Sequence, residues 1–250
     1  MMFIAIGTFS IIELQKLQHD CTELVTQMVQ PALWLLIFGT TFNHLHVINT
    51  GAPSYLVFLT PGIIAQSTLF TSIFYGIQIL WDRDAGILDK LLTTPAPTAA
   101  LVTGKAFAAG VRSIGLVVGV LMFAYLMGVP LTMNPLRILT AMGIVVLGAT
   151  FFACLSMTLA GILRNRDRLL AVGRAITMPL FFASDALYPV DVMPTWLRHF
   201  SMVNPLSHEV NALRTLLAGA PFRPWDTVFL VLAAVVSIAS AAALLRRLVR

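Results

Sequence analysis

The feature that most constrains this chain is a succession of long apolar segments that contain almost no charged side chains. Six such segments lie at approximately residues 25–42, 55–80, 106–128, 138–163, 169–184 and 226–245. A helix of about 20 apolar residues spans the hydrocarbon core of a bilayer, which is about 30 Å thick. Only 11% of the 250 residues are charged, about half of the share usual in soluble domains. We therefore expect an all-α polytopic membrane protein with six transmembrane helices.

The basic residues predict how these helices are oriented, because Lys and Arg accumulate in cytoplasmic loops. With the N-terminus inside, only Arg137, Arg198, Arg214 and Arg223 of the 16 Lys and Arg residues fall outside. Both termini are therefore expected on the cytoplasmic side. The net charge of +5 then reflects membrane topology and not nucleic-acid binding, because no basic stripe with interleaved aromatic residues lies on a soluble domain.

A polar interruption between the second and third segments, residues 81–105, carries a cluster of charged side chains. Its apolar residues recur at helical spacing, at Ile87, Leu88, Leu91 and Leu92, and Pro95 and Pro97 follow them. This pattern predicts a short amphipathic helix that ends before the prolines. Such a helix is suited to docking a soluble partner, and the alternative is a solvated loop with one helical turn. A second, smaller contact candidate is the basic loop 161–168.

The sequence of this interruption resembles the signature of ABC-2 type permeases, the membrane subunits of a class of ATP-driven exporters. The matching residues are Asp84, Gly86, Ile87, Leu88, Leu91, Leu92, Thr94, Pro95, Gly104 and Lys105. The resemblance implies that this segment is the coupling helix, which sits in a cleft of the ATPase subunit. The implied ATPase contacts are Asp84, Gly86, Leu88, Leu91, Leu92, Thr94 and Pro95. Leu88 and Leu91 would supply the apolar contact, and Asp84 would orient the start of the helix.

The chain ends are expected to lie outside the membrane-spanning domain, with domains at residues 1–24, 25–245 and 246–250. Apolar and polar residues alternate loosely along residues 4–22, which predicts an amphipathic helix on the inner leaflet. This helix resembles the elbow helix of the same family, and the alternative is an ordinary frayed helix. The last domain is a short basic tail.

The longest segment on the outer side, residues 185–223, contains two stretches that favour helix, 194–200 and 207–217. Both are apolar and too short to span, so re-entrant or interfacial helices are expected. The segment also resembles the family at Tyr188, Pro189, Pro194, Trp196, Leu197, Asn204, Pro205, Leu206, Ala212, Leu213 and Arg214. Departures from the family pattern occur at Asp185, His208 and Asn211.

The chain lacks the residues that would power transport. It has no G-x-x-x-x-G-K-[ST] sequence, so we expect no cofactor in this chain and place ATP and magnesium in a partner ATPase. The apolar segments are almost free of acidic residues, with Asp226 at the very start of the last one, which argues against the alternative of an ion- or proton-coupled secondary carrier. His44 and His46, or Cys21 and Cys154, do not form a metal-ligand set. A third alternative, a non-transporting scaffold, does not explain the coupling-like helix.

The resemblance implies an exporter that moves an amphipathic small molecule, such as a drug, a lipid or a lipid-linked glycan. Within that family, short chains of this type resemble the drug-resistance and nodulation-factor exporters. Two ATPase subunits and a second permease copy, identical or related, are the implied partners, together with the lipids of a bacterial plasma membrane. Candidate pathway residues, each of which could instead face lipid or pack internally, are Trp34, Phe38, Phe70, Phe74, Tyr75, Met178, Phe182 and Asp185. Asp185 would attract cationic amphiphiles at the exit; alternatively it caps a helix or pairs with Arg198 or Arg214.

Overall fold

The computed structural model describes Gly7, Ile11 and residues 21–45, 51–92, 98–132, 134–221 and 223–245, without the side chains of residues 21–24, 89, 91 and 92. All regular structure within these ranges is helical, which confirms the predicted all-α class. The helices are α2 (Cys21–Leu33), η1 (Trp34–Gly39), α3 (Thr40–Leu45), α4 (Tyr55–Asp84), α5 (Ile87–Leu92), α6 (Thr98–Leu126), α7 (Pro135–Leu163), α8 (Arg166–Phe182), η2 (Val190–Val192), α9 (Thr195–Val203), α10 (Pro205–Leu217) and α11 (Pro224–Leu245). The expected amphipathic helix at residues 4–22 lies almost wholly outside the described residues.

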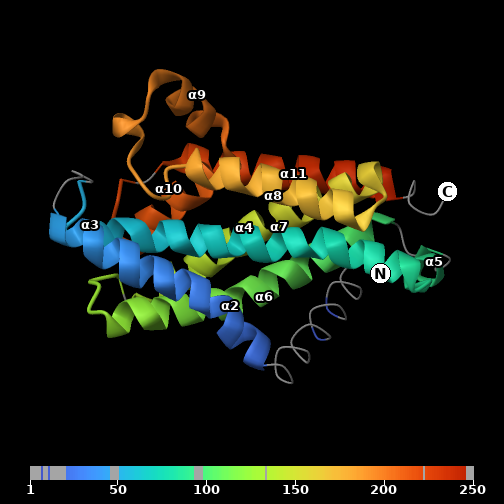
Figure 1. Cartoon of the computed structure of the whole chain (residues 1–250), viewed down its shortest axis with the longest axis horizontal. Coiled ribbons are helices and arrows are strands. Elements are labelled where there is room, and N and C mark those ends of the chain that lie inside the picture. The colour runs from blue at the N-terminus through green and yellow to red at the C-terminus, as the bar shows by residue number, and fades with distance from the viewer. Residues whose placement is uncertain are drawn as a thin grey trace.

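Five helical stretches are long and apolar enough to cross a membrane. They are Val25–His44, Tyr55–Asp84, Thr98–Leu126, Pro135–Leu163 and Pro224–Leu245, and they coincide with five of the six predicted segments. The remaining segment, predicted at 169–184, is the helix α8 of 17 residues, or about 26 Å at 1.5 Å per residue. It lies alongside α4 (Figure 1) and packs against α4 and α7.

The first span is continuous but irregular. Pro31 lies inside α2, and the helix then widens into the π-helical segment η1 before α3 completes the span. Proline lacks a backbone N–H and its ring clashes with the preceding turn, so the regular hydrogen-bond ladder cannot continue unchanged. The π-segment begins three residues later, and such short π-segments occur as local bulges within α-helices. The sequence pattern alone predicted a plain helix here.

Asparagine residues fix the ends of two later helices. The side chain of Asn134 accepts a hydrogen bond from the backbone N–H of Leu136, with Pro135 at the first helical position of α7. At the other end, Arg164 adopts a left-handed conformation with φ of 53°. Asn165 then caps α8 by accepting from the N–H of Arg168. The predicted basic loop is therefore a tight turn between α7 and α8.

The helix α4 is the centre of the bundle and contacts α6, α7, α8 and α10. In its most apolar stretch 89% of the residues are buried, against 28% for α11, which lies at the periphery. The backbones of α4 and α7 approach closely at Gly76, where the Ser156 hydroxyl donates to the carbonyl of Ile73 at 2.6 Å. A side chain at position 76 would collide with α7, which explains the glycine.

The two ends of the bundle are different. In Figure 1, α5 and the last turns of α11 lie at one end, and α3, α9 and α10 lie at the other. The two short helices predicted in residues 185–223 are confirmed as α9 and α10. α10 packs against α4, α7 and α11, so the outer segment is joined to the membrane helices by extensive contact.

Candidate functional site

At one end of the bundle, the start of α5 is held by a network of ionic contacts. Gly86 has φ of 68°, a conformation that turns the chain from α4 into α5 and that other residues rarely adopt. Asp84 pairs with Arg83 at 2.8 Å and also with Arg166 of α8. Arg83 in turn donates to the carbonyl of Arg164 at 3.1 Å. The two predicted contact regions, α5 and the α7–α8 turn, are therefore joined to each other.

The helix α5 presents a different face from the one we predicted. Leu88 is 0% exposed and packs in a cluster with Leu80, Leu101 and Val102, whereas Ile87 is 48% exposed. Leu88 thus rests on α4 and α6 of its own chain, and Ile87 is the exposed apolar side chain of α5 among the described residues. The contact of α5 with an ATPase stays a prediction. The side chains of Leu91 and Leu92, and all of Thr94 and Pro95, lie outside the described residues.

A cavity of about 330 Å³ opens between α2, α4 and α6. It is lined by Thr26, Gln27, Gln30, Pro31, Gln66, Ser67, Phe70, Thr71, Phe74, Tyr75, Gln78, Trp81, Arg112 and Leu116. Three of the predicted pathway residues, Phe70, Phe74 and Tyr75, are among them. Its third wall is α6, the third span. An ion pair between Lys105 and Asp82 joins α6 to α4 beyond one end of the cavity.

The other pathway candidates do not line this cavity. Trp34 stacks on Phe38 with ring centroids 4.3 Å apart and meets Phe181 edge-on at 5.7 Å, which is an internal packing role. Met178 and Phe182 are exposed on α8 by 48% and 46%. Such apolar exposure on a membrane helix is consistent with contact to lipid or to a second protein.

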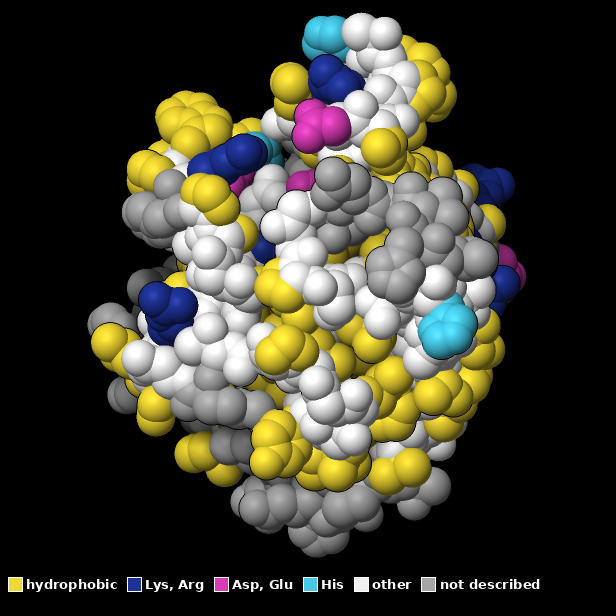
Figure 2. Space-filling view, turned by 90° about the vertical axis from the view of Figure 1, so that its left-hand side faces the viewer, with side chains coloured by type: hydrophobic (Ala, Val, Ile, Leu, Met, Phe, Trp, Pro, Cys, Tyr) yellow, Lys and Arg dark blue, Asp and Glu magenta, His cyan; other side chains and the backbone are white. Residues whose placement is uncertain are grey.

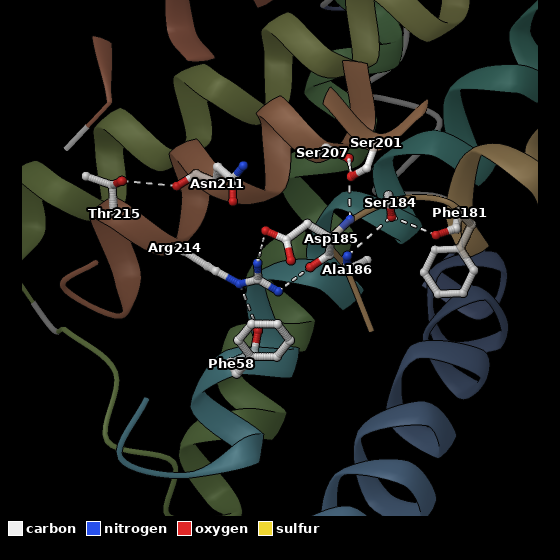
Figure 3. A network of polar contacts seen from close by, with 10 residues as sticks. All are labelled: Phe58, Phe181, Ser184, Asp185, Ala186, Ser201, Ser207, Asn211, Arg214 and Thr215. Atoms are coloured by element: carbon white, nitrogen blue, oxygen red, sulfur yellow. Dashed lines mark hydrogen bonds and ion pairs between the residues drawn. The ribbon is translucent and has the colours of Figure 1, made fainter. Parts of the chain in front are cut away.

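At the opposite end, Asp185 is part of a buried ionic network (Figure 3). An Nη1–Oδ2 ion pair of 2.8 Å joins Arg214 to Asp185, and Arg214 Nη2 donates to the Asp185 carbonyl. The same guanidinium lies 3.6 Å from the ring centroid of Phe58 and donates through Nε to the Phe58 carbonyl at 3.3 Å. The alternative in which Asp185 pairs with Arg214 is thereby confirmed. The pair joins the segment after α8 to α10 and α4.

The network lies in the wall of a larger hollow of about 1080 Å³ at this end. Figure 2 looks onto it and shows acidic and basic side chains around a recess beside the protruding α9 region. A second buried pair contributes to the wall, in which His208 Nδ1 lies 2.6 Å from Asp226 Oδ1 and His208 Nε2 lies 3.0 Å from the Met202 carbonyl. Charges of both signs are therefore paired around the hollow.

The structure also reveals one buried acid that sequence reasoning missed. Glu209 of α10 is 0% exposed, and neither carboxylate oxygen has a hydrogen-bond partner among the described residues. It lies against Gly148, near the middle of α7. An acidic side chain therefore does enter the bundle, although not on an apolar segment. The helical period could have located it, because Glu209 falls on the same face as Leu206 and Leu213.

Comparison with known proteins identifies this architecture. Residues 6–218 match the model of a family described as ABC-2 type transporter. The chain belongs to the ABC-2 type transporter family. It is 30% identical over 207 residues to ycf38 of Cyanophora paradoxa, described as a transport permease, covering 80% of this chain and 70% of that protein.

Two further relatives have more specific names. The daunorubicin resistance ABC transporter permease protein DrrB1 of Streptomyces coeruleorubidus is 23% identical over 84% of this chain and 73% of its own length. Nodulation protein J of Rhizobium leguminosarum bv. trifolii is 25% identical over 80% of this chain and 75% of its own length. ABC-2 permeases work with an ABC ATPase subunit that is a separate chain. This ABC-2 protein is therefore the membrane subunit of an ABC transporter.

Proposed function

We propose that this permease exports an amphipathic small molecule from the cytoplasm or the inner leaflet, powered by two ABC ATPase subunits. The observation that carries this proposal is the continuity of α4. One helix provides residues 66–81 of the cavity wall and ends at Asp84, directly before α5. A displacement of α5 by an ATPase would therefore be transmitted along a single rigid element to the cavity.

The ionic network at α5 supports the same mechanism. Asp84 bonds Arg166, and Arg83 bonds the carbonyl of Arg164, so the beginning of α8 would move with α5. α4 and α8 form opposite-running neighbours in the bundle. ATP-driven motion at α5 would then reorient both helices together.

We further propose that α8 is the sixth crossing. It begins beside the α5 end and finishes next to the Asp185 network at the other end, so it traverses the bundle despite its short length. With six crossings both termini face the cytoplasm, in agreement with the distribution of Lys and Arg. The membrane in question is the plasma membrane of a bacterium.

The functional unit is proposed to contain two permease copies. The exposed aromatic and apolar residues of η1 and α8, among them Phe38, Met178 and Phe182, provide a surface on which a second copy can pack. The substrate is placed among amphiphiles because the cavity combines polar side chains with the aromatic rings of Phe70, Phe74 and Trp81. The drug-resistance name of one relative is in keeping with that class.

A docking experiment tests the proposal. Ile87→Asp puts a charge on the exposed apolar position of α5, and we expect loss of ATPase copurification with normal membrane insertion. Ile162→Asp is the matched control, because Ile162 is 60% exposed near the same end of the bundle but belongs to α7. Burial of one isoleucine contributes about 1.5–3 kcal/mol, so binding should weaken by about tenfold or more. Full copurification of the Ile87→Asp protein would exclude docking through this face.

A further inference from the structure

All four glutamines in the described part of the chain line one cavity. Gln27 and Gln30 reach it from α2, and Gln66 and Gln78 reach it from α4. Hydroxyl groups of Thr26, Ser67 and Thr71 lie in the same wall. Polar side chains on membrane helices are costly and usually mark a pathway or a binding site. Their convergence from separate helices indicates that the cavity is built to contact a polar group.

The cavity extends from one end of the bundle toward its middle. The ion pair of Lys105 with Asp82 sets α6 against α4 in antiparallel register. Arg112 follows Lys105 by seven residues on α6, and Tyr75 precedes Asp82 by seven residues on α4. Both therefore lie about 10 Å further into the bundle than this ion pair. Gln66 is 16 residues from Asp82 in sequence, or about 24 Å at 1.5 Å per residue. The polar lining therefore continues into the apolar layer.

Gln66 provides the most direct evidence for a ligand. Its side chain is 3% exposed, and its Oε1 atom has no hydrogen-bond partner among the described residues. A buried acceptor without a donor is unfavourable, because it has lost its hydrogen bond to water and gained none in the protein. A ligand that donates a hydroxyl or amide hydrogen at this position would remove the cost. The deep part of the cavity thus favours a donor-bearing polar head.

The remaining lining excludes one class of head group. Among the described residues that line the cavity there is no carboxylate, and the charged side chain is that of Arg112. A quaternary ammonium head has no hydrogen to donate to Gln66, and it would meet no carboxylate among these described lining residues. The aromatic rings of Phe70, Phe74 and Trp81 can pack against an apolar body. A volume of about 330 Å³ is at the small end of ligand pockets and suits a head group with the start of its chain.

We infer that this cavity is the head-group site of the exported amphiphile, and that it selects a hydroxyl- or amide-bearing head without positive charge. Gln66 is the specificity-determining residue. The inference rests on the proposed export function and assigns it a substrate class. It also places the site between α2, α4 and α6 of a single chain.

The test is binding to the full-length protein in phosphatidylcholine nanodiscs. Trp81 lines the cavity. When Trp34, Trp196 and Trp225 are each replaced by Phe, the fluorescence of Trp81 reports whether the cavity is occupied. The two probes are an alkyl glucoside and an alkyltrimethylammonium with identical brominated chains, because bromine quenches tryptophan on contact. Quenching from the surrounding bilayer is common to both probes, and the head group alone distinguishes them.

We expect saturable quenching by the glucoside at lower concentration than by the ammonium probe. Gln66→Leu should weaken glucoside binding about threefold to tenfold, the loss of one hydrogen bond. Gln66→Glu should shift the preference toward the ammonium probe. Thr60→Val is the control, because Thr60 is buried on the same helix but does not line the cavity.

Three results would contradict the inference. Equal quenching by both probes would make the cavity a site for ordinary lipid, and a preference of the unmodified protein for the ammonium probe would reverse the assigned class. An unchanged glucoside affinity in Gln66→Leu would remove Gln66 from the site. None of these measurements involves an ATPase, so they fail or succeed independently of the copurification test with Ile87→Asp.

Discussion

The close contact between α4 and α7 at Gly76 leads to a quantitative prediction for the variant Gly76→Ala. A methyl group at this position would lie 2.6 Å from the carbonyl oxygen of Ser156 and 2.5 Å from its carbonyl carbon. Ordinary contacts of a Cβ atom begin at about 3.4 Å. The helices would have to separate by about 0.9 Å, the difference between 3.4 Å and the 2.5 Å to the carbonyl carbon, because backbone atoms cannot rotate away.

The energetic effect has three contributions. Overpacking of this kind costs about 1–3 kcal/mol. Separation of the helices also lengthens the 2.6 Å hydrogen bond from Ser156 to Ile73, and such bonds in membrane proteins average about 0.6 kcal/mol. Against these costs, alanine is favoured over glycine in a helix by about 1 kcal/mol. The matched variant Gly143→Ala has only the last contribution, because nothing lies within 4 Å of a Cβ at Gly143.

The difference between the two variants is therefore about 2–4 kcal/mol, with Gly76→Ala the less stable. This corresponds to a melting temperature lower by about 5–10 °C in a protein of this size. Thermal unfolding of both proteins in the same detergent, followed by the loss of monodisperse protein, measures it. Equal melting temperatures would show that α4 and α7 are not in backbone contact at this point.

Two other sites give further predictions. Gly148→Ala should destabilise the protein, because the new methyl group would lie 2.6 Å from Glu209 Oε1. Glu209→Ala should suppress much of this loss of stability in the double variant. A double-mutant cycle of thermal stability measures the effect. Additive effects would argue against the contact. Asp185→Asn leaves the buried Arg214 without its counter-ion and should lower the free energy of unfolding by about 3–5 kcal/mol. Asp191→Asn, in the same outer segment, is the control and should have little effect. A stable Asp185→Asn protein that loses transport only of cations would instead support the exit role for Asp185.

The fold could be predicted from the sequence because its signals are local. Apolar segments and basic loops located five spanning helices and the helix α8, and helical spacing with the following prolines located α5. The π-segment η1 was not predicted, since the spacing of apolar residues does not distinguish a π-helical turn from an α-helical one. The direction of Leu88 could not be predicted either. Spacing shows that residues share one face, but not whether that face meets another protein or the helices of its own chain.

The candidate site was predicted only in part. Phe70, Phe74 and Tyr75 were selected as aromatic residues of one span, and the structure brings them together with Gln66. The convergence of the glutamines depends on the antiparallel register of α4 and α6 and on the approach of α2, which no single segment encodes. The partner of Asp185 was among the alternatives, because a buried acid requires a nearby cation.

The uneven burial of the spanning helices has a consequence for how this sequence can vary. α11 is covered by protein over only 28% of its most apolar stretch, so much of its surface needs only to dissolve in lipid, a requirement that any of several apolar residues meets. α4, covered over 89%, must instead fit neighbours of fixed shape on nearly every side. Exchange of Leu, Ile, Val and Phe should be nearly neutral along the outer face of α11 and harmful along α4. The match to the family ends at residue 218, before α11 begins, as expected for a segment whose composition is selected more strongly than its order.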